Sequence, residues 1–108
     1  MSFKVFLTAD AARDLEELYQ YIVRHDVTGK AEHVLAKIEK TCTSLSETPE
    51  RGAYPKELMS LGIRDYREVF FKPYRLIYRI MGDTVYVLLI VDGRRDMQTL
   101  LQRRLLEN

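Results

Sequence analysis

Arginine dominates the basic residues in the second half of this 108-residue chain. Residues 54–108 carry ten Lys and Arg against seven Asp and Glu, and eight of those ten are Arg. Residues 1–53 carry seven against nine, so the net charge is only +1. A guanidinium offers a planar fork of donors that matches carboxylate and phosphate oxygens. The pattern indicates an anionic partner, although charge alone favours the simpler interpretation that these arginines solvate strands and a terminal helix.

Other kinds of site chemistry have little support in the sequence. The five glycines are scattered over predicted turns, so we expect no glycine-rich phosphate loop. His25 and His33 lie eight residues apart and form no zinc-binding set with the single Cys42. Cys42 falls on the apolar side of a predicted helix, which indicates a core thiol. We therefore expect no metal, no cofactor and no conventional nucleophilic catalysis.

A strand and two helices precede the arginine-rich half. Residues 3–7 are aromatic and β-branched and predict a short strand, after which Thr8 can cap a helix. The apolar residues of this helix recur at three-and-four spacing, at Ala12, Leu15, Leu18, Tyr19 and Ile22. A second helix, beginning near Lys30, has the stripe Ala31, Val34, Leu35, Ile38, Cys42 and Leu45. Together they predict a helical hairpin.

The second half changes to the period of β-strands. Residues 64–71 and 74–81 alternate in character, and the apolar run within 84–91 is typical of a central strand covered on both faces. The middle strand carries Leu76, Tyr78 and Ile80 on one face and Arg75, Ile77 and Arg79 on the other. Residues 97–106 predict a last helix. The sequence thus predicts one α+β domain, residues 1–108, arranged β-α-α-β-β-β-α, with the hairpin packed on a small, mainly antiparallel, twisted sheet.

The sequence also bears on location. Nothing at the N-terminus resembles a signal peptide, and the longest apolar run, 85–91, is far shorter than a membrane span. The single cysteine cannot form an internal disulfide. We expect a soluble cytoplasmic protein that does not associate with membranes.

Three motifs follow one another at a characteristic spacing. They are Leu7–Leu15 with Tyr19 and Ile22, then Tyr66-Arg67 with Tyr74–Ile80, and finally Val91–Asp96. In this order they resemble the RelE/ParE superfamily of bacterial toxins, and the ParE (plasmid stabilisation) branch more closely. The resemblance implies a toxin of a type II toxin–antitoxin system that a cognate antitoxin silences. It also implies no specific DNA binding by the toxin without its antitoxin.

The resemblance leaves two targets open. ParE-like toxins poison DNA gyrase without chemistry of their own, whereas RelE-like toxins cleave mRNA on the ribosome. For a nuclease, the resemblance implies that Arg75 and Arg95 stabilise phosphate and that Arg67 lies near a basic position. Proton transfer would then fall to Tyr66, Tyr74 or Asp96.

Two positions depart from the RelE pattern. Val69 falls where a basic residue is expected, and Leu101 falls where RelE has a tyrosine. No histidine follows His33, although other ribosome-dependent relatives place one near the C-terminus. We therefore predict a non-catalytic gyrase inhibitor. The alternatives are a ribosome-dependent mRNA endoribonuclease of RelE type and a degenerate toxin that only binds antitoxin.

The sequence also suggests two sets of partner-binding residues. We predict that the target is bound by Arg67, Arg75, Arg79, Arg94 and Arg95. We predict that the antitoxin covers exposed apolar side chains at Ile77, Leu101 and Leu105. In the competing interpretation, the strand arginines pair with Glu68 or Asp65, and the leucines pack the last helix onto the sheet. Arg94 and Arg95, adjacent at a strand end, are the least easily explained in this way.

Overall fold

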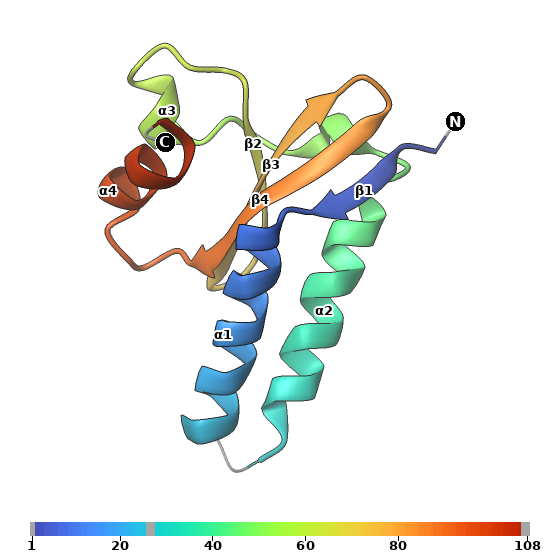
Figure 1. Ribbon diagram of the computed structural model, residues 1–108, viewed down its shortest axis with the longest axis vertical. Coiled ribbons are helices and arrows are strands. Elements are labelled where there is room, and N and C mark those ends of the chain that lie inside the picture. Colours follow the sequence, from blue (N-terminus) through green and yellow to red (C-terminus); the bar gives the residue numbers. More distant parts are fainter. Residues whose placement is uncertain (1, 26–27, 107–108) are drawn as a thin grey trace.

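A computed structural model describes residues 2–25 and 28–106 (Figure 1). β1 (Lys4–Leu7) leads into a hairpin of two helices, α1 (Ala9–His25) and α2 (Lys30–Ser44). A 3₁₀ turn, η1 (Pro49–Arg51), and a short helix, α3 (Lys56–Met59), follow. The remaining elements are β2 (Arg67–Phe71), β3 (Tyr74–Met81), β4 (Thr84–Asp92), α4 (Met97–Leu101) and a π-helical turn, η2 (Gln102–Leu106). None of the described helices is long and apolar enough to cross a bilayer.

The four strands form one sheet in the order β1-β4-β3-β2. β1 runs parallel to β4, and the other two pairings are antiparallel. The predicted α+β arrangement and mainly antiparallel sheet are therefore confirmed. The β3–β4 register shifts once, because Ile77 is opposite Leu89 whereas Tyr78 is opposite Val87. The shift leaves Leu88 without a partner in β3.

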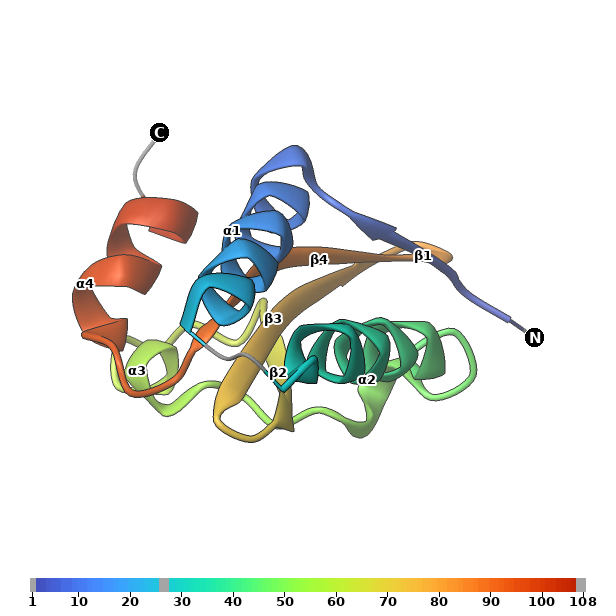
Figure 2. The ribbon, with the colours of Figure 1, turned by 90° about the horizontal axis from the view of Figure 1, so that it is seen from below.

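Successive residues of a strand point to opposite faces, and both faces of this sheet are covered. The α1–α2 hairpin packs on the first face, where the buried core includes Leu76 and Tyr78. α3 and α4 pack on the second face against Ile77, Leu89 and Val91. Figure 2 shows α3 and α4 together, well away from α2. The predicted alternation in β3 and the central place of β4 are thus confirmed.

The ends of two elements differ from the sequence prediction, and two short elements were not predicted. β2 begins only at Arg67, because Ile63 and Tyr66 pack on the second core instead of continuing the strand. The last helix is α-helical only to Leu101 and then widens into η2. α3 and η1 were not predicted. Thr8 does cap α1, since its Oγ1 accepts a hydrogen bond from the Ala11 amide at 3.1 Å.

The largely buried carboxylate of Asp14 joins α1 to the C-terminal segment. The carboxylate of Asp14 accepts two hydrogen bonds from the guanidinium of Arg104, each at 3.0 Å, and one from the Ile90 amide at 3.1 Å. Arg104 also donates to the carbonyl of Leu88 at 3.1 Å. The pair therefore satisfies backbone groups at the position where the β3–β4 register shifts, and it fixes η2 against α1 and β4.

Replacing Arg104 with alanine should lower the free energy of unfolding by about 1–3 kcal/mol, because a largely buried carboxylate loses its main partner. Urea unfolding measures the change. Arg103→Ala is the matched control, since Arg103 is exposed and makes no hydrogen bond or ion pair with the described residues. We expect this control to change stability by less than about 0.5 kcal/mol. Equal losses in the two variants would contradict a role for the Asp14–Arg104 pair.

Candidate functional site

The loop after β4 carries the adjacent arginines that the sequence singled out. Asp92 ends the strand, and Asp96 caps α4 by accepting hydrogen bonds from the amide of Thr99 at 3.2 Å and its hydroxyl at 2.8 Å. The hydroxyl of Thr99 holds the pKa of Asp96 below its ordinary value. The Asp96 carboxylate is therefore engaged in ending the loop, which leaves it poorly suited to transferring a proton.

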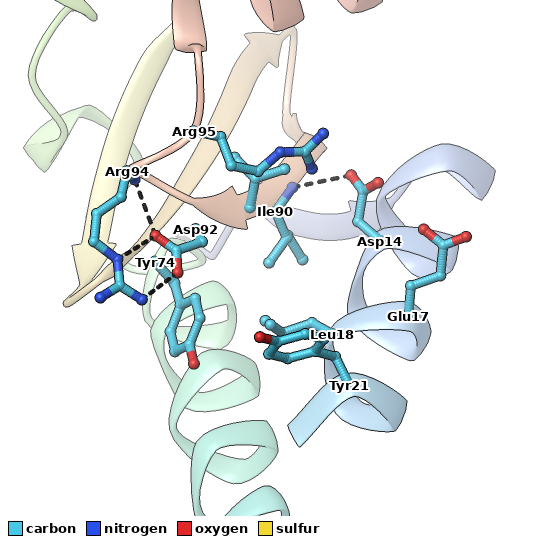
Figure 3. Close-up of a pocket in the computed structure, with 10 residues that line it drawn as sticks. Asp14, Glu17, Leu18, Tyr21, Tyr74, Ile90, Asp92, Arg94 and Arg95 are labelled. Atoms are coloured by element: carbon cyan, nitrogen blue, oxygen red, sulfur yellow. Dashed lines mark hydrogen bonds and ion pairs between the residues drawn. The ribbon is translucent and has the colours of Figure 1, made fainter. Parts of the chain in front are cut away.

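A pocket of about 470 Å³ opens between α1 and this loop (Figure 3). Its charged and aromatic lining comes from α1, β3, the end of β4 and the loop: Asp14, Glu17, Tyr21, Tyr74, Asp92, Arg94 and Arg95. Acidic side chains thus face basic ones across the pocket. Burial raises the pKa of Tyr74, and the nearby Asp92 raises it further, so its hydroxyl stays protonated at neutral pH.

The two loop arginines, Arg94 and Arg95, differ in whether a carboxylate pairs with them. Arg94 folds back on Asp92, with Nε to Oδ1 at 2.9 Å and Nη2 to Oδ2 at 2.6 Å, and holds the pKa of Asp92 below its ordinary value. Arg95 is exposed and makes no hydrogen bond or ion pair with the described residues. In Figure 3 it extends on the side of the pocket away from Arg94, toward α1. Arg95 therefore has its donors available for a partner.

Arg75, expected to contact a target or a phosphate, is instead a buried structural residue. Its guanidinium forms a two-pronged pair with the Glu57 carboxylate, at 2.8 and 2.9 Å, and its Nε donates to Glu68 at 2.7 Å. The three side chains are only 8–11% exposed. Arg75 holds the pKa of Glu57 below its ordinary value, whereas burial raises that of Glu68. α3 and β2 each supply a carboxylate that covers Arg75, so its guanidinium is already paired with acidic side chains.

Gly93 connects this buried cluster to the loop above it. A Cβ at Gly93 would lie 2.7 Å from Cδ of Arg75, closer than real Cβ contacts allow. The Gly93 amide also donates to the carbonyl of Pro73 at 2.8 Å. The loop crosses directly over the aliphatic stem of Arg75, so the residue at position 93 must lack a side chain.

Two other strand arginines lie on opposite faces of the sheet, because Arg67 is opposite Tyr78 on the first face whereas Arg79 follows Tyr78 in β3 and lies on the second face. Arg67 donates to the carbonyls of Glu50 and Gly52, at 3.2 and 2.9 Å, and to the Tyr54 hydroxyl at 3.2 Å. Arg79 lies 3.7 Å from Asp65, and its Cζ is 5.7 Å from the ring centre of Tyr66. The competing prediction of ion pairs is therefore confirmed for Arg75 with Glu68 and for Arg79 with Asp65. Tyr66 is half-buried beneath Arg79.

The predicted exposed apolar residues are mostly core. Ile77 and Leu101 are both fully buried in the second core, so the prediction that they are exposed is wrong. Leu101 closes the sheet face that α4 covers, and Ile77 lies beneath it in the same cluster. Leu105 is half-buried at the edge of that cluster. Of the three, Leu105 alone retains an accessible surface.

Cys42 and the histidines contribute no reactive centre. Cys42 is 4% exposed, and burial raises the pKa of its thiol to about 11, which confirms the predicted core thiol. Among residues 2–25 and 28–106, no group of three or more His, Cys, Asp or Glu side chains is placed to hold a metal ion. His25 stacks on Tyr21 at 4.1 Å between ring centres, and His33 lies edge-on to Phe71.

Sequence reasoning missed Glu57, Asp14 and Arg104. Asp14 had a signal, because it falls at the helical spacing of the buried positions Ala11 and Ile22. A carboxylate at such a position requires a buried partner. Glu57 had no comparable signal, since it lies in a one-turn helix within a stretch without periodicity.

Comparison with known proteins identifies the family. Residues 5–97 match the family model described as the ParE toxin of the type II toxin–antitoxin system, parDE. This match covers most of the chain.

The chain belongs to the ParE toxin family.

Relatives of this ParE family member include the Toxin ParE3 of Caulobacter vibrioides, which is 27% identical over 101 residues. That match covers 94% of this chain and 97% of the relative. The resemblance to the RelE/ParE superfamily and the role as a toxin of a type II toxin–antitoxin system are therefore confirmed.

Solved structures share the fold. The chromosomal ParDE system from P. aeruginosa superposes with a TM-score of 0.70 at 22% identity, covering 84% of this chain and 96% of that one. The RelBE2 toxin–antitoxin complex from Mycobacterium tuberculosis gives 0.63 at 24% identity, covering 85% and 99%. A free mutant of the E. coli toxin RelE gives 0.62 at 14% identity, covering 93% of each chain.

Proposed function

We propose that this ParE family toxin inhibits DNA gyrase by binding it, without a chemical step of its own. We further propose that the toxin acts in the cytoplasm and that a cognate antitoxin neutralises it. Family membership supports the toxin role, and the ParDE and RelBE2 structures named above are toxin–antitoxin systems. DNA gyrase is the target that the resemblance to ParE implies.

The observation that carries the non-catalytic part of the proposal is the state of Arg75. A nuclease of RelE type would need this guanidinium to stabilise charge on a phosphate. Here Glu57 and Glu68 already occupy its donors. A phosphate approaching Arg75 would displace or meet two carboxylates in a buried site, which is unfavourable. A toxin that acts only by binding its target needs no guanidinium to stabilise a phosphate. The free donors of Arg95 are compatible with such binding.

Two purified assays test the choice of target. In the first, the toxin is added to DNA gyrase during ATP-dependent supercoiling of a relaxed plasmid. In the second, it is added to ribosomes stalled on an mRNA with an empty A site. We expect inhibited supercoiling and intact mRNA. Cleaved mRNA with unaffected supercoiling would establish the endoribonuclease alternative, and the absence of both effects from folded protein would indicate a degenerate toxin.

Arg95→Ala should weaken inhibition of gyrase by about tenfold, the effect of roughly 1.4 kcal/mol of lost binding energy. The reason is that Arg95 is exposed and has free donors, whereas Arg94 is paired with Asp92. Arg94→Ala is therefore the matched control and should have the smaller effect. Circular dichroism and urea unfolding should show native stability in both variants. Undiminished inhibition by well-folded Arg95→Ala protein would remove Arg95 from the target-binding set.

A further inference from the structure

The pocket between α1 and the loop after β4 holds two charged side chains that have no partner among the described residues. Two of its acidic side chains, Asp14 and Asp92, already have arginine partners. Glu17 lines the pocket from α1, is exposed, and makes no hydrogen bond or ion pair with the described residues. Arg95 lines it from the loop and is likewise unpaired. The pocket therefore offers one free carboxylate and one free guanidinium.

The rest of the lining is largely apolar and aromatic. It includes Leu18 and Ile90, and the rings of Tyr21 and Tyr74 lie on the same side of the pocket (Figure 3). Neither of these two tyrosine hydroxyls makes a hydrogen bond with the described residues, so both can bond to a ligand. The pocket volume of about 470 Å³ is within the range of small-molecule sites, roughly 300–1,000 Å³.

We propose that this pocket binds a free α-amino acid with an apolar or aromatic side chain. The ammonium group of the ligand pairs with Glu17, and its carboxylate pairs with Arg95. Its side chain packs on the rings of Tyr21 and Tyr74. An α-amino acid is a zwitterion at neutral pH, so one small molecule supplies both of the charges that the pocket lacks.

The charges of the pocket favour a zwitterion over a ligand of a single sign. A simple anion or cation would match one of the two free groups and leave the other unmatched. A phosphate would in addition meet the three carboxylates of the lining. Arg95 extends toward α1, the helix that carries Glu17 (Figure 3), so the two charges approach one another as a small zwitterion requires.

A bound amino acid would withhold Arg95 from the target of the toxin. This consequence rests on the proposed function, in which Arg95 contacts gyrase. The binding site itself does not rest on it, because its test uses only the toxin and small ligands. Absence of gyrase inhibition and absence of amino-acid binding are therefore separate results.

The test is a titration of the isotopically labelled toxin, followed by NMR on backbone amides and arginine Nε–H groups. The probe is L-phenylalanine. N-acetyl-L-phenylalanine lacks its ammonium charge, L-phenylalaninamide lacks its carboxylate, and glycine keeps both charges but has no side chain. The titrations are made at about pH 6, below the ordinary α-amino pKa, so that the amine of the amide stays protonated.

We expect phenylalanine to shift the signals of Leu18, Tyr21 and Arg95 and to bind about tenfold more tightly than any of the other three ligands. Each of those ligands lacks one of the three contacts proposed for the pocket. This comparison is made on the native toxin, so it does not depend on the folding of any variant.

Two variants assign each charge of the ligand to its partner. Glu17→Gln should weaken phenylalanine binding about tenfold and leave binding of the N-acetyl derivative little changed, because that derivative has no ammonium to pair. Arg95→Gln should weaken phenylalanine binding about tenfold and leave binding of the amide little changed. The matched controls, Glu16→Gln and Arg103→Gln, change exposed side chains outside the pocket and should bind phenylalanine like the native toxin.

Three results would overturn the proposal. Equal affinity for phenylalanine and its two derivatives would show that the pocket does not recognise a zwitterion. Signals shifted on another surface, or none shifted up to the solubility limit of phenylalanine, would show that the pocket is not an amino-acid site. Losses of phenylalanine binding as large in the two controls as in Glu17→Gln and Arg95→Gln would show that Glu17 and Arg95 do not hold the ligand.

Discussion

Arg75→Met is expected to lower the free energy of unfolding by about 3–5 kcal/mol, because removing one partner of a buried ion pair leaves uncompensated charge. In this protein the uncompensated charges would be two carboxylates, Glu57 and Glu68, with side chains 11% and 8% exposed. Methionine keeps most of the aliphatic stem that packs beneath Gly93, so the loss is assigned to charge and not to a cavity. Urea unfolding at neutral pH measures it directly.

Arg79→Met is the matched control for this substitution. Arg79 lies on the same strand and face, but its side chain is 40% exposed and its nearest carboxylate is 3.7 Å away. Exposed pairs of this kind contribute about 0–1 kcal/mol. Adding Glu57→Gln and Glu68→Gln to Arg75→Met should restore part of the lost stability, because no buried charge then remains. A loss in Arg75→Met no larger than that in Arg79→Met would contradict the structural role of the cluster.

The contribution of Glu57 to the pH dependence of stability should differ in sign between the two proteins. In the native toxin Arg75 lowers the pKa of Glu57, so this stabilisation is present above the ordinary glutamate pKa and is lost as pH falls through the lowered value. In Arg75→Met the buried carboxylates lose the guanidinium that pairs with them, so burial should raise their pKa values. The variant should therefore gain stability as pH falls through those raised values. The gap between native and variant proteins narrows toward acid.

The sequence was most informative where buried side chains recur at the regular spacing of a helix or a strand. The stripe of α2, the two faces of β3 and the buried Cys42 were predicted correctly, and so was the stripe of α1 except at Ala12, which is exposed while Ala11 is buried. Each depends on residues within a few positions of one another, and the hydrophobic effect imposes the same period on any amphipathic element. The central position of β4 could be predicted for the same reason, since its run of apolar residues requires cover on both faces.

The candidate site could be predicted only in part, because its state depends on distant partners. Alternation placed Arg75 on the second face, but it could not show that Glu57, eighteen positions earlier, would cover it. The covering helix α3 has one turn and no periodic signal. Arg95 lies at a strand exit, where loops have few packing partners, and so its exposure was easier to anticipate.

Removing residues 100–108 is the second change with a large expected effect. The deletion takes Leu100 and Leu101 from the second core, and Leu→Ala changes at buried positions already cost about 2–5 kcal/mol each. It also takes Arg104 from Asp14. We expect a loss of more than about 4 kcal/mol in urea unfolding, a large share of the roughly 5–15 kcal/mol that stabilises a typical domain. Loss of toxicity in this variant would therefore report unfolding and not a binding surface.

A point substitution separates those two explanations. Leu106 is 41% exposed in η2 and belongs to neither core, so Leu106→Ser should change stability by less than about 0.5 kcal/mol. If this variant keeps native stability and still binds antitoxin or target less tightly, the C-terminal segment contacts a partner as well as closing the sheet. Unchanged binding would restrict the segment to its structural role. Native stability of the deletion variant in urea would contradict the structural role of the C-terminal segment. The second core would then be stable without these residues of α4.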